Sequence, residues 1–309
     1  MNKKYAGCDL NEIIVGEPLP TTLYLFINSK FITYRTPGDI IDRNTYIRFE
    51  LKKVKNLYIK QEDLEKFKLW SKKHTPELPG LPPETQDFQE SRQATQRKML
   101  DIFQSNHPDK AITLAMGASK KLVFEVIKFP YTAHNLTLLQ LYSRGAVDHS
   151  VNVSVLSVYI AMQMGYSHAV TLQHIGAGGL LHDVGKSKVL IKDEDTEEIV
   201  RDKMIEHPML GAALLEGQEK IPNEVRTIVS QHHECFDGSG YPNRLRGNAI
   251  YDLTRIVSIA NVFDDLMGEV RGTIYERQKE AIELLDTNYY NLFDPEKLDK
   301  SIKILKKGF

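Results

Sequence analysis

The proline-rich segment at residues 74–86, HTPELPGLPPETQ, limits what this chain can fold into more than any other stretch. Proline fixes the backbone angle φ and has no N–H to donate, so this span cannot lie inside a helix or a central strand. We therefore predict a linker here, with one folded part before it and another after it. The chain length of 309 residues agrees with about two domains.

Strand-like runs dominate the part before the linker. Residues rich in β-branched and aromatic side chains predict strands at 21–27, 30–35 and 44–51, with a turn at 36–39. Apolar residues near helical spacing predict a helix over 61–73. Because this part has neither a histidine nor a glycine-rich phosphate loop, we expect it to regulate the chain or to bind a partner protein.

After the linker the pattern becomes helical, and strand signals are scarce. Residues 149–164, HSVNVSVLSVYIAMQM, are nearly all apolar and predict a helix buried in the core. Further helices are expected at 89–104, 110–129, 167–182, 198–205, 208–216, 222–233, 252–267 and 275–285. The predicted fold class is mostly α, with a small N-terminal α/β module followed by an all-helical bundle. We expect residues 1–73 to form the module, 74–88 the linker and 89–309 the helical domain.

Composition argues against several classes of protein. The formal net charge of −1 gives no basic field, which argues against a nucleic-acid polymer as partner. No apolar run approaches the ~20 residues of a membrane span, and the first residues lack the apolar core of a signal peptide. Two cysteines, Cys8 and Cys235, make no disulfide framework and favour a reducing compartment. We therefore expect a soluble, cytoplasmic protein.

Ionisable residues recur beside the apolar helices of the second part. In the helix at 222–233, His232 follows Val225, Ile228 and Val229 at helical spacing, so its ring should point along the buried face. Burying several such groups is costly unless they are paired or bind a metal. Imidazole with carboxylate suits Zn, Fe, Mn or Ni. The candidates for such a site are His149, His182, Asp183, His207, His232 and His233.

The order of these residues resembles a known family. The series comprises His149, His182-Asp183-x-Gly-Lys, His207-Pro, His232-His233-Glu, Asp237-Gly-Ser-Gly-Tyr-Pro and RIVSIANVFDDL at 255–266. It resembles the HD-GYP family, a branch of the HD-domain metal phosphohydrolases, over about residues 140–300. The resemblance implies a helical scaffold with two or three metal ions, often iron. It also implies hydrolysis of cyclic di-GMP, to pGpG or GMP, by a hydroxide that the metals activate.

The resemblance assigns roles to individual positions. It makes His149, His182 and Asp183 ligands of one ion. Asp183 would also bind a second ion together with His207, His232 and His233. Asp183 and Lys186 would be catalytic, and Lys186, Gly240 and Tyr241 would contact the substrate.

One departure from the family concerns the metals. Asn261 stands where members have a metal-binding Asp, while Asp264 and Asp265 follow three and four residues later. Asn261 and Asp264 are our candidate further ligands, and Asp265 remains an alternative. Gly145 stands where members with three metals carry Glu, so we expect two divalent ions. Iron is the first choice, with manganese or another transition metal as alternatives.

Other departures fall on substrate contacts. Val270 and Gly272 stand where the family has an Arg and a Tyr, and the stretch after the HD motif, SKVLIKDED at 187–195, lacks the usual proline. The expected function is a cyclic-di-GMP phosphodiesterase of bacterial second-messenger signalling, with weakened activity. One alternative is a weakly active or inactive adaptor that binds the nucleotide or, through the N-terminal module, a signalling protein. Another is a metallophosphatase that acts on a different nucleotide.

Overall fold

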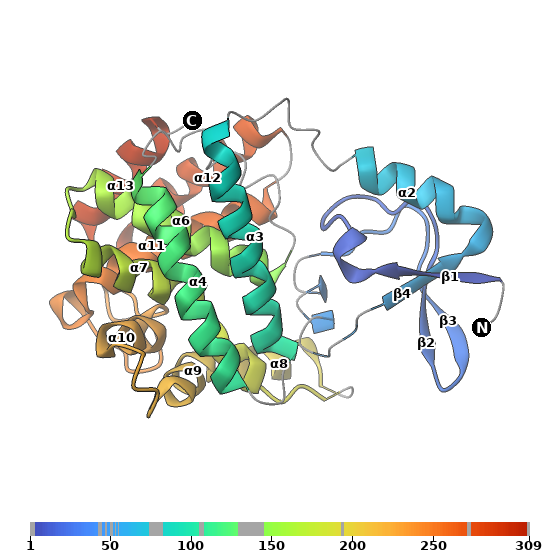
Figure 1. Ribbon diagram of the computed structural model, residues 1–309, viewed down its shortest axis with the longest axis horizontal. Helices are drawn as coiled ribbons and strands as arrows, with labels where there is room; N and C mark the ends of the chain where they lie inside the picture. Colours follow the sequence, from blue (N-terminus) through green and yellow to red (C-terminus); the bar gives the residue numbers. More distant parts are fainter. Residues whose placement is uncertain are drawn as a thin grey trace. The chain divides into compact units, whose positions relative to one another are not determined.

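The computed structural model divides the chain into two compact units (Figure 1). The first comprises residues 1–80 with 144–146, and the second comprises 81–143 with 147–309. The residues that the structure describes are 4–42, 45–46, 48–49, 52, 54, 56–73, 83–104, 108–128, 145–192, 195–270 and 273–307. Most of the predicted linker, residues 74–82, lies outside the described residues.

The first unit contains a four-stranded antiparallel sheet. Its strands are β1 (Tyr5–Asp9), β2 (Leu23–Ile27), β3 (Lys30–Arg35) and β4 (Asn56–Lys60), in the order β1-β4-β2-β3. Asn28 and Ser29 join β2 to β3, and both have positive φ, which matches the twist of a two-residue hairpin. A single turn η2 (Gln61–Asp63) leads into helix α2 (Leu64–Lys73).

The predicted strand at 44–51 is wrong. The described residues 45–46 and 48–49 are helical, and β1 and β4 complete the sheet instead. The reason lies in the spacing of two aromatic side chains. Tyr46 and Phe49 are three positions apart and both are buried, which is the spacing of a helical face rather than of a strand.

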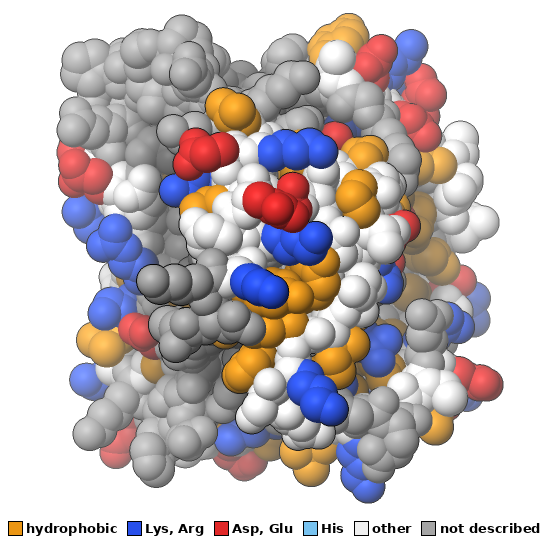
Figure 2. Space-filling model, turned by 90° about the vertical axis from the view of Figure 1, so that its right-hand side faces the viewer, with side chains coloured by type: hydrophobic (Ala, Val, Ile, Leu, Met, Phe, Trp, Pro, Cys, Tyr) orange, Lys and Arg blue, Asp and Glu red, His pale blue; other side chains and the backbone are white. Residues whose placement is uncertain are grey.

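The two faces of this sheet differ. One face buries Leu23, Leu57 and Ile59 in a core that also contains Phe67 of α2. Elsewhere on the sheet, aromatic rings from separate strands contact one another, such as Tyr5 and Phe31 with ring centroids 3.9 Å apart. Exposed hydrophobic side chains lie beside Lys and Arg side chains on the surface that Figure 2 shows.

The second unit is helical. Its longer helices are α3 (Pro83–Gln104), α4 (Pro108–Lys128), α6 (Ala146–Gln163), α7 (Ala169–Leu181), α8 (Glu197–Met204), α9 (His207–Leu215), α10 (Asn223–Gln231), α11 (Asp252–Glu269), α12 (Ile274–Asn288) and α13 (Pro295–Lys307). Short 3-10 turns are η3 (Val184–Lys188), η4 (Gly247–Ala249) and η5 (Tyr290–Leu292). The predicted fold class, mostly α after a small α/β module, is confirmed.

Two helices depart most from the prediction. Helix α3 begins at Pro83, earlier than the predicted residue 89, so the end of the predicted linker is helical. Proline is favoured in the first turn of a helix, where its missing N–H would have no partner. Helix α13 was not predicted, although Leu298, Ile302 and Leu305 form a buried stripe at helical spacing.

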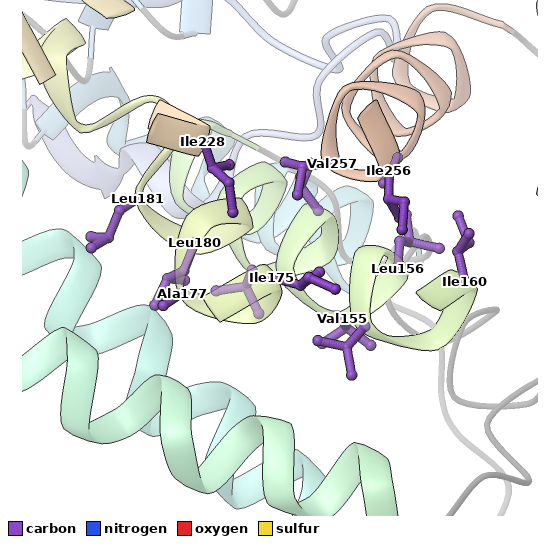
Figure 3. Close-up of a cluster of buried hydrophobic side chains, with 14 of the residues drawn as sticks. Val155, Leu156, Ile160, Ile175, Ala177, Leu180, Leu181, Ile228, Ile256 and Val257 are labelled. Carbon is purple, nitrogen blue, oxygen red and sulfur yellow. The ribbon is translucent and has the colours of Figure 1, made fainter. Parts of the chain in front are cut away.

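Helices α6 and α7 form the centre of the second unit's core (Figure 3). Side chains such as Leu156 of α6 and Ile175 of α7 are fully buried there. The helices approach closely because α7 carries glycines: a Cβ on Gly179 would lie 2.9 Å from the Cα of Ser154. This packing fixes the end of α7, where the HD motif follows. Among the described residues, no helix has the length and hydropathy to cross a bilayer.

Candidate metal centre

Helix ends bring the candidate ligands together. His149 lies in the first turn of α6, and His182 and Asp183 follow the last residue of α7. His207 is the first residue of α9, and His232 and His233 follow the last residue of α10. Four helices that meet in one core therefore present their ends to a common point.

Gly185 and Gly211 allow the turn η3 to approach helix α9 closely. A Cβ on Gly185 would lie 2.0 Å from the carbonyl oxygen of His207 and 2.4 Å from the backbone nitrogen of Gly211. No side chain fits in that space, so the turn after Asp183 packs directly on the backbone of α9. The glycine of the HD motif is thus required by the chain's own packing.

The side chains form two clusters that share one carboxylate. The first cluster is His149, His182 and Asp183, and the second is Asp183, His207, His232 and His233. Within each cluster, one ligand atom from every residue lies within 4.8 Å of the others. His233 is partly exposed, and the remaining members are buried. The sequence-predicted ligands on these positions are therefore brought together.

Backbone carbonyls orient three of the rings. Nδ1 of His182 lies 2.7 Å from the carbonyl oxygen of Gly179, Nδ1 of His207 lies 2.6 Å from that of Met204, and Nδ1 of His232 lies 2.8 Å from that of Val229. A carbonyl only accepts hydrogen bonds, so each Nδ1 carries the proton. In the neutral ring, Nε2 is then left as a lone pair.

These Nε2 atoms face each other. Nε2 of His207 lies 3.0 Å from Nε2 of His232, and Nε2 of His149 lies 3.2 Å from Nε2 of His182. Two lone pairs at this separation repel, whereas a cation placed between them is attracted to both. The donor set of imidazole and carboxylate is the one that divalent transition metals prefer. The residues present therefore fit a pair of metal ions.

Asp183 strengthens that fit. Its Oδ1 is buried and has no hydrogen-bond partner in the described part of the chain, although Nε2 of His207 lies 3.1 Å away. Burial alone would raise the pKa of this carboxyl, but the adjacent His182 and Lys186 outweigh burial and hold the pKa well below its usual range. Asp183 is thus an anion with an unsatisfied oxygen between two groups of imidazoles.

The environment of the three imidazoles in the second cluster favours their neutral form. Burial lowers the pKa of His207, His232 and His233, because a charged imidazole loses its hydration in the core. The neighbouring histidines lower the pKa of His232 and His233 further. Neutral imidazole is the form that binds metals, so this environment favours metal binding at neutral pH.

The structure separates the further ligand candidates. Oδ2 of Asp264 lies 2.8 Å from Nδ1 of His149, on the side of the ring opposite the cluster, and Oδ1 of Asp264 accepts a hydrogen bond of 3.0 Å from Asn152. Oδ1 of Asp265 lies 3.7 Å from the same Nδ1. Asn261 is buried on α11, and its role as a ligand stays a prediction. The prediction that Asp264 binds the metal directly therefore lacks support from this geometry.

Lys186 lies beside the shared carboxylate. Its Nζ is 2.5 Å from Oδ2 of Asp183, and its side chain remains partly exposed. The ammonium group can therefore reach an anion that approaches the clusters from solvent.

The positions that depart from the family pattern lie near helix ends or outside the described residues. Val270 caps α11 and Gly145 precedes α6, whereas Gly272 lies outside the described residues.

The DGSGYP loop packs against the second cluster. The Tyr241 ring stacks on His233, with centroids 4.7 Å apart, and the Tyr241 N–H donates to the His233 carbonyl. Gly240 has no positive φ, and a Cβ there would lie 2.2 Å from the backbone nitrogen of Cys235. Close packing within the loop therefore requires Gly240, and its predicted contact with substrate stays a prediction.

Two polar residues that the sequence patterns did not indicate also support this site. The buried Glu234 carboxylate accepts hydrogen bonds from the backbone N–H groups of Asn243 and Leu245, which closes the loop. Asn152, fully buried, donates to Asp264. Asn152 lies three positions after His149 on one helix, so the spacing placed it on the same face and could have indicated it.

The fold and these clusters define a class of protein: a helical bundle whose core contains two buried His/Asp clusters consistent with a binuclear metal site. A family model described as HD domain matches residues 134–296, more than half of the chain. The chain therefore belongs to the HD-domain family, and the predicted membership of its HD-GYP branch is confirmed.

Relatives and a solved structure agree with this assignment. The chain is 34% identical over 149 residues to the cyclic di-GMP phosphodiesterase response regulator RpfG of Xanthomonas campestris, covering 47% of this chain and 39% of the relative. It is 29% identical over 185 residues to the 3′3′-cGAMP-specific phosphodiesterase 3 of Vibrio cholerae, covering 58% and 37%. The chain thus spans less than half the length of these curated relatives.

The solved structure is Bd1817, an HDG"Y"P protein from Bdellovibrio bacteriovorus. It matches with a TM-score of 0.60 over 98% of this chain and 99% of its own, at 22% sequence identity. At this identity the likeness concerns the fold.

Proposed function

We propose that this chain is a metal-dependent phosphodiesterase that hydrolyses cyclic di-GMP to pGpG or GMP. The observation that carries the proposal is the pair of buried clusters that share Asp183 in a chain of the HD-domain family. The relatives that this chain matches in sequence include the cyclic di-GMP phosphodiesterase response regulator RpfG. We place the chain in bacterial second-messenger signalling on the same grounds.

The residues divide the chemical work. The clusters would hold two divalent ions, iron first and manganese as an alternative, with imidazole Nε2 atoms and the Asp183 carboxylate as ligands. When bound, such ions lower the pKa of water and stabilise negative charge on phosphoryl oxygens. Asp183 and Lys186 are the proposed catalytic residues, because the carboxylate joins the clusters and the ammonium lies beside it.

Two groups of the chain face the expected phosphodiester. Lys186 would neutralise charge on a non-bridging oxygen, since a charge-assisted hydrogen bond is stronger than a neutral one. Burial raises the pKa of the Tyr241 phenol, so the O–H stays protonated at neutral pH and can donate to a phosphate oxygen. The Tyr241 ring stacks on His233 of the second cluster, which supports this role.

Two relatives support a second candidate substrate. Proteins described as 3′3′-cGAMP-specific phosphodiesterases 3 and 2 of Vibrio cholerae match this chain at 29% identity. Cyclic di-GMP and 3′3′-cGAMP share the cyclic phosphodiester and differ in one base. The clusters alone would act on either nucleotide, so the choice depends on contacts to the bases.

The adaptor alternative depends on the substrate positions. Val270 has no charge where the family has an Arg, which lowers the expected affinity for the nucleotide. The first unit would then contribute binding of a signalling protein. Metal binding without turnover is the property that separates this alternative from the enzyme.

The deciding experiment combines metal analysis with hydrolysis. The purified chain is loaded anaerobically with Fe or Mn, its metal content is measured, and cyclic di-GMP and 3′3′-cGAMP are supplied separately with products resolved by chromatography. We expect two ions per chain and conversion of cyclic di-GMP to linear products. His182→Ala should abolish conversion, whereas His168→Ala, at an exposed position before α7, should not.

Other outcomes assign other functions. Faster hydrolysis of 3′3′-cGAMP than of cyclic di-GMP would select the second candidate substrate. Two tightly bound ions without turnover of either nucleotide would select the adaptor. A chain that binds no metal would refute the proposal as a whole.

A further inference from the structure

Asp264 lies behind the first cluster rather than within it. It is fully buried on α11, and His149 lies on α6. Nε2 of His149 points to the cluster, 3.2 Å from Nε2 of His182, while Nδ1 of the same ring meets Oδ2 of Asp264 at 2.8 Å. The two nitrogens of imidazole point in different directions. A carboxylate on Nδ1 therefore holds the ring from the side that a metal ion would not occupy.

Both oxygens of Asp264 are engaged. Oδ2 faces His149, and Oδ1 accepts the hydrogen bond from Nδ2 of Asn152. Asn152 and His149 lie one turn apart on the same helix, so together they hold one carboxylate of α11 against α6. This arrangement fixes the proton of His149 on Nδ1 and leaves the Nε2 lone pair for the cluster.

Asn152 lowers the stability of the fold at this position. It is fully buried, and its Oδ1 has no hydrogen-bond partner in the described part of the chain. A buried acceptor without a partner is destabilising, so stability alone does not explain an amide here. The Nδ2 group of the same amide donates to Asp264 and orients it, which gives a reason for the presence of Asn152.

We propose that Asp264 and Asn152 are positioning residues of His149 and that neither binds the metal. Asn152 orients Asp264, and Asp264 orients the ring and increases the basicity of its Nε2. Asp264 thereby places a negative charge behind His149, a ligand of the first cluster. Asn261, which stands where family members have a metal-binding Asp, is neutral and supplies no such charge. The inference rests on metal binding and is independent of the nucleotide that the chain hydrolyses.

Metal titration tests this assignment without any substrate. Manganese is titrated into the metal-free chain against a chelator of known affinity, and the two affinities are resolved. Asp264→Asn should weaken one of the two sites about 10–100-fold, as losses behind a ligating histidine do elsewhere. Asn152→Ala should weaken the same site by a smaller factor. Asp265→Asn is the matched control: it removes the same charge one residue away, at 3.7 Å and half exposed, and should change neither site more than twofold.

The second cluster serves as an internal control for folding. A variant that merely disturbs the bundle would weaken both sites, whereas a positioning role affects the site of His149 alone. The site concerned is identified with His149→Ala: adding Asp264→Asn to that variant should cause no further loss, because the two residues act as one unit.

Several results would overturn the assignment. These are equal weakening of both sites, unchanged affinity in Asp264→Asn, or a wild-type chain that binds fewer than two ions. A metal-loaded crystal structure with an Asp264 oxygen at the ~2.0–2.2 Å of a direct bond would do so as well. Failure to hydrolyse cyclic di-GMP would refute the proposed function and leave this assignment standing.

Discussion

The two clusters of the metal centre are held in different ways. In the second cluster, the Nδ1 atoms of His207 and His232 bond to carbonyls three residues earlier in the chain. In the first cluster, His182 follows the same rule, but His149 depends on Asp264, 115 positions away. Both clusters require the helices to pack, but the rings of His182, His207 and His232 are oriented locally by helix ends, whereas the ring of His149 is oriented only once α6 and α11 have packed.

Helix chemistry explains the local rule. The last carbonyl groups of an α-helix have no partner within the helix. Gly179, Met204 and Val229 lie in the last turns of α7, α8 and α10, and each gives its carbonyl to a histidine that follows. A helix end thus satisfies its own backbone and aims a ligand in one interaction. No such carbonyl serves His149, because it lies at the start of a helix.

Removing the shared carboxylate would break both clusters at once and is the largest effect we expect. Asp183→Asn should bring the metal content from two ions per chain to none and reduce hydrolysis by roughly 10³-fold or more. Metal analysis and product chromatography measure the two losses. Asp202→Asn, an exposed carboxylate on α8, is the control and should behave like wild type. Retention of one ion in Asp183→Asn would show that one cluster stands without it.

Forcing the clusters apart tests whether backbone contact sets their spacing. Gly185→Ala should destabilise the fold by about 1–3 kcal/mol or more, since its Cβ would meet the His207 carbonyl. Urea unfolding measures the change. Gly117→Ala is the matched control, because a Cβ in that place on α4 meets nothing within 4 Å and should stabilise the helix slightly. Equal stability of the two variants would contradict the packing argument.

Acid should destabilise the metal-free chain mainly through the second cluster. Burial lowers the folded-state pKa of His207, His232 and His233, whereas the unfolded rings titrate near about 6.5. Below that pH the unfolded chain binds protons that the folded chain excludes, so stability should fall as pH falls through about 6.5. Urea unfolding of chelator-treated protein at several pH values measures this. In His233→Gln the decline should be shallower, and in the exposed His168→Ala it should be unchanged.

The loop beside the second cluster gives the smallest expected effect. Glu234→Gln keeps one acceptor for the N–H groups of Asn243 and Leu245 but turns the other into a donor. The loop should lose about 1–3 kcal/mol of local stability, and KM should rise a few-fold with metal content unchanged. Glu219→Gln, on an exposed carboxylate, is the control. Loss of metal in Glu234→Gln would mean that the loop helps to hold the cluster itself.

The contrast between local and distant support also explains what the sequence could predict. Helical spacing indicated the buried position of His232, and the resemblance to the family indicated His207 and the HD pair; the surroundings of these histidines are set largely within one helix end. Apolar periodicity located most helices of the bundle. The position of Asp264 was left open, because Asp264 and Asp265 are neighbours on one helix and only packing decides which of them faces His149.

Errors in the first unit have a similar origin. The β-branched and aromatic side chains of residues 44–51 suited a strand, but Tyr46 and Phe49 are buried on one helical face. β1 and β4 pair across more than fifty positions, with Tyr5 opposite Lys60, and nothing local marks either strand as strongly as the hairpin turn marks β2 and β3. Long-range pairing is the part of a sheet that local patterns describe least.

The last turns of α7, α8 and α10 carry a consequence for motion. Helix termini ordinarily fray first, and their amides exchange with solvent sooner than those of the helix middle. Here each of these turns is tied to an imidazole through a single carbonyl, so a cation that captures the imidazole also restrains the turn. Metal occupancy would then be detectable as slower amide hydrogen exchange in the C-terminal turns of these three helices.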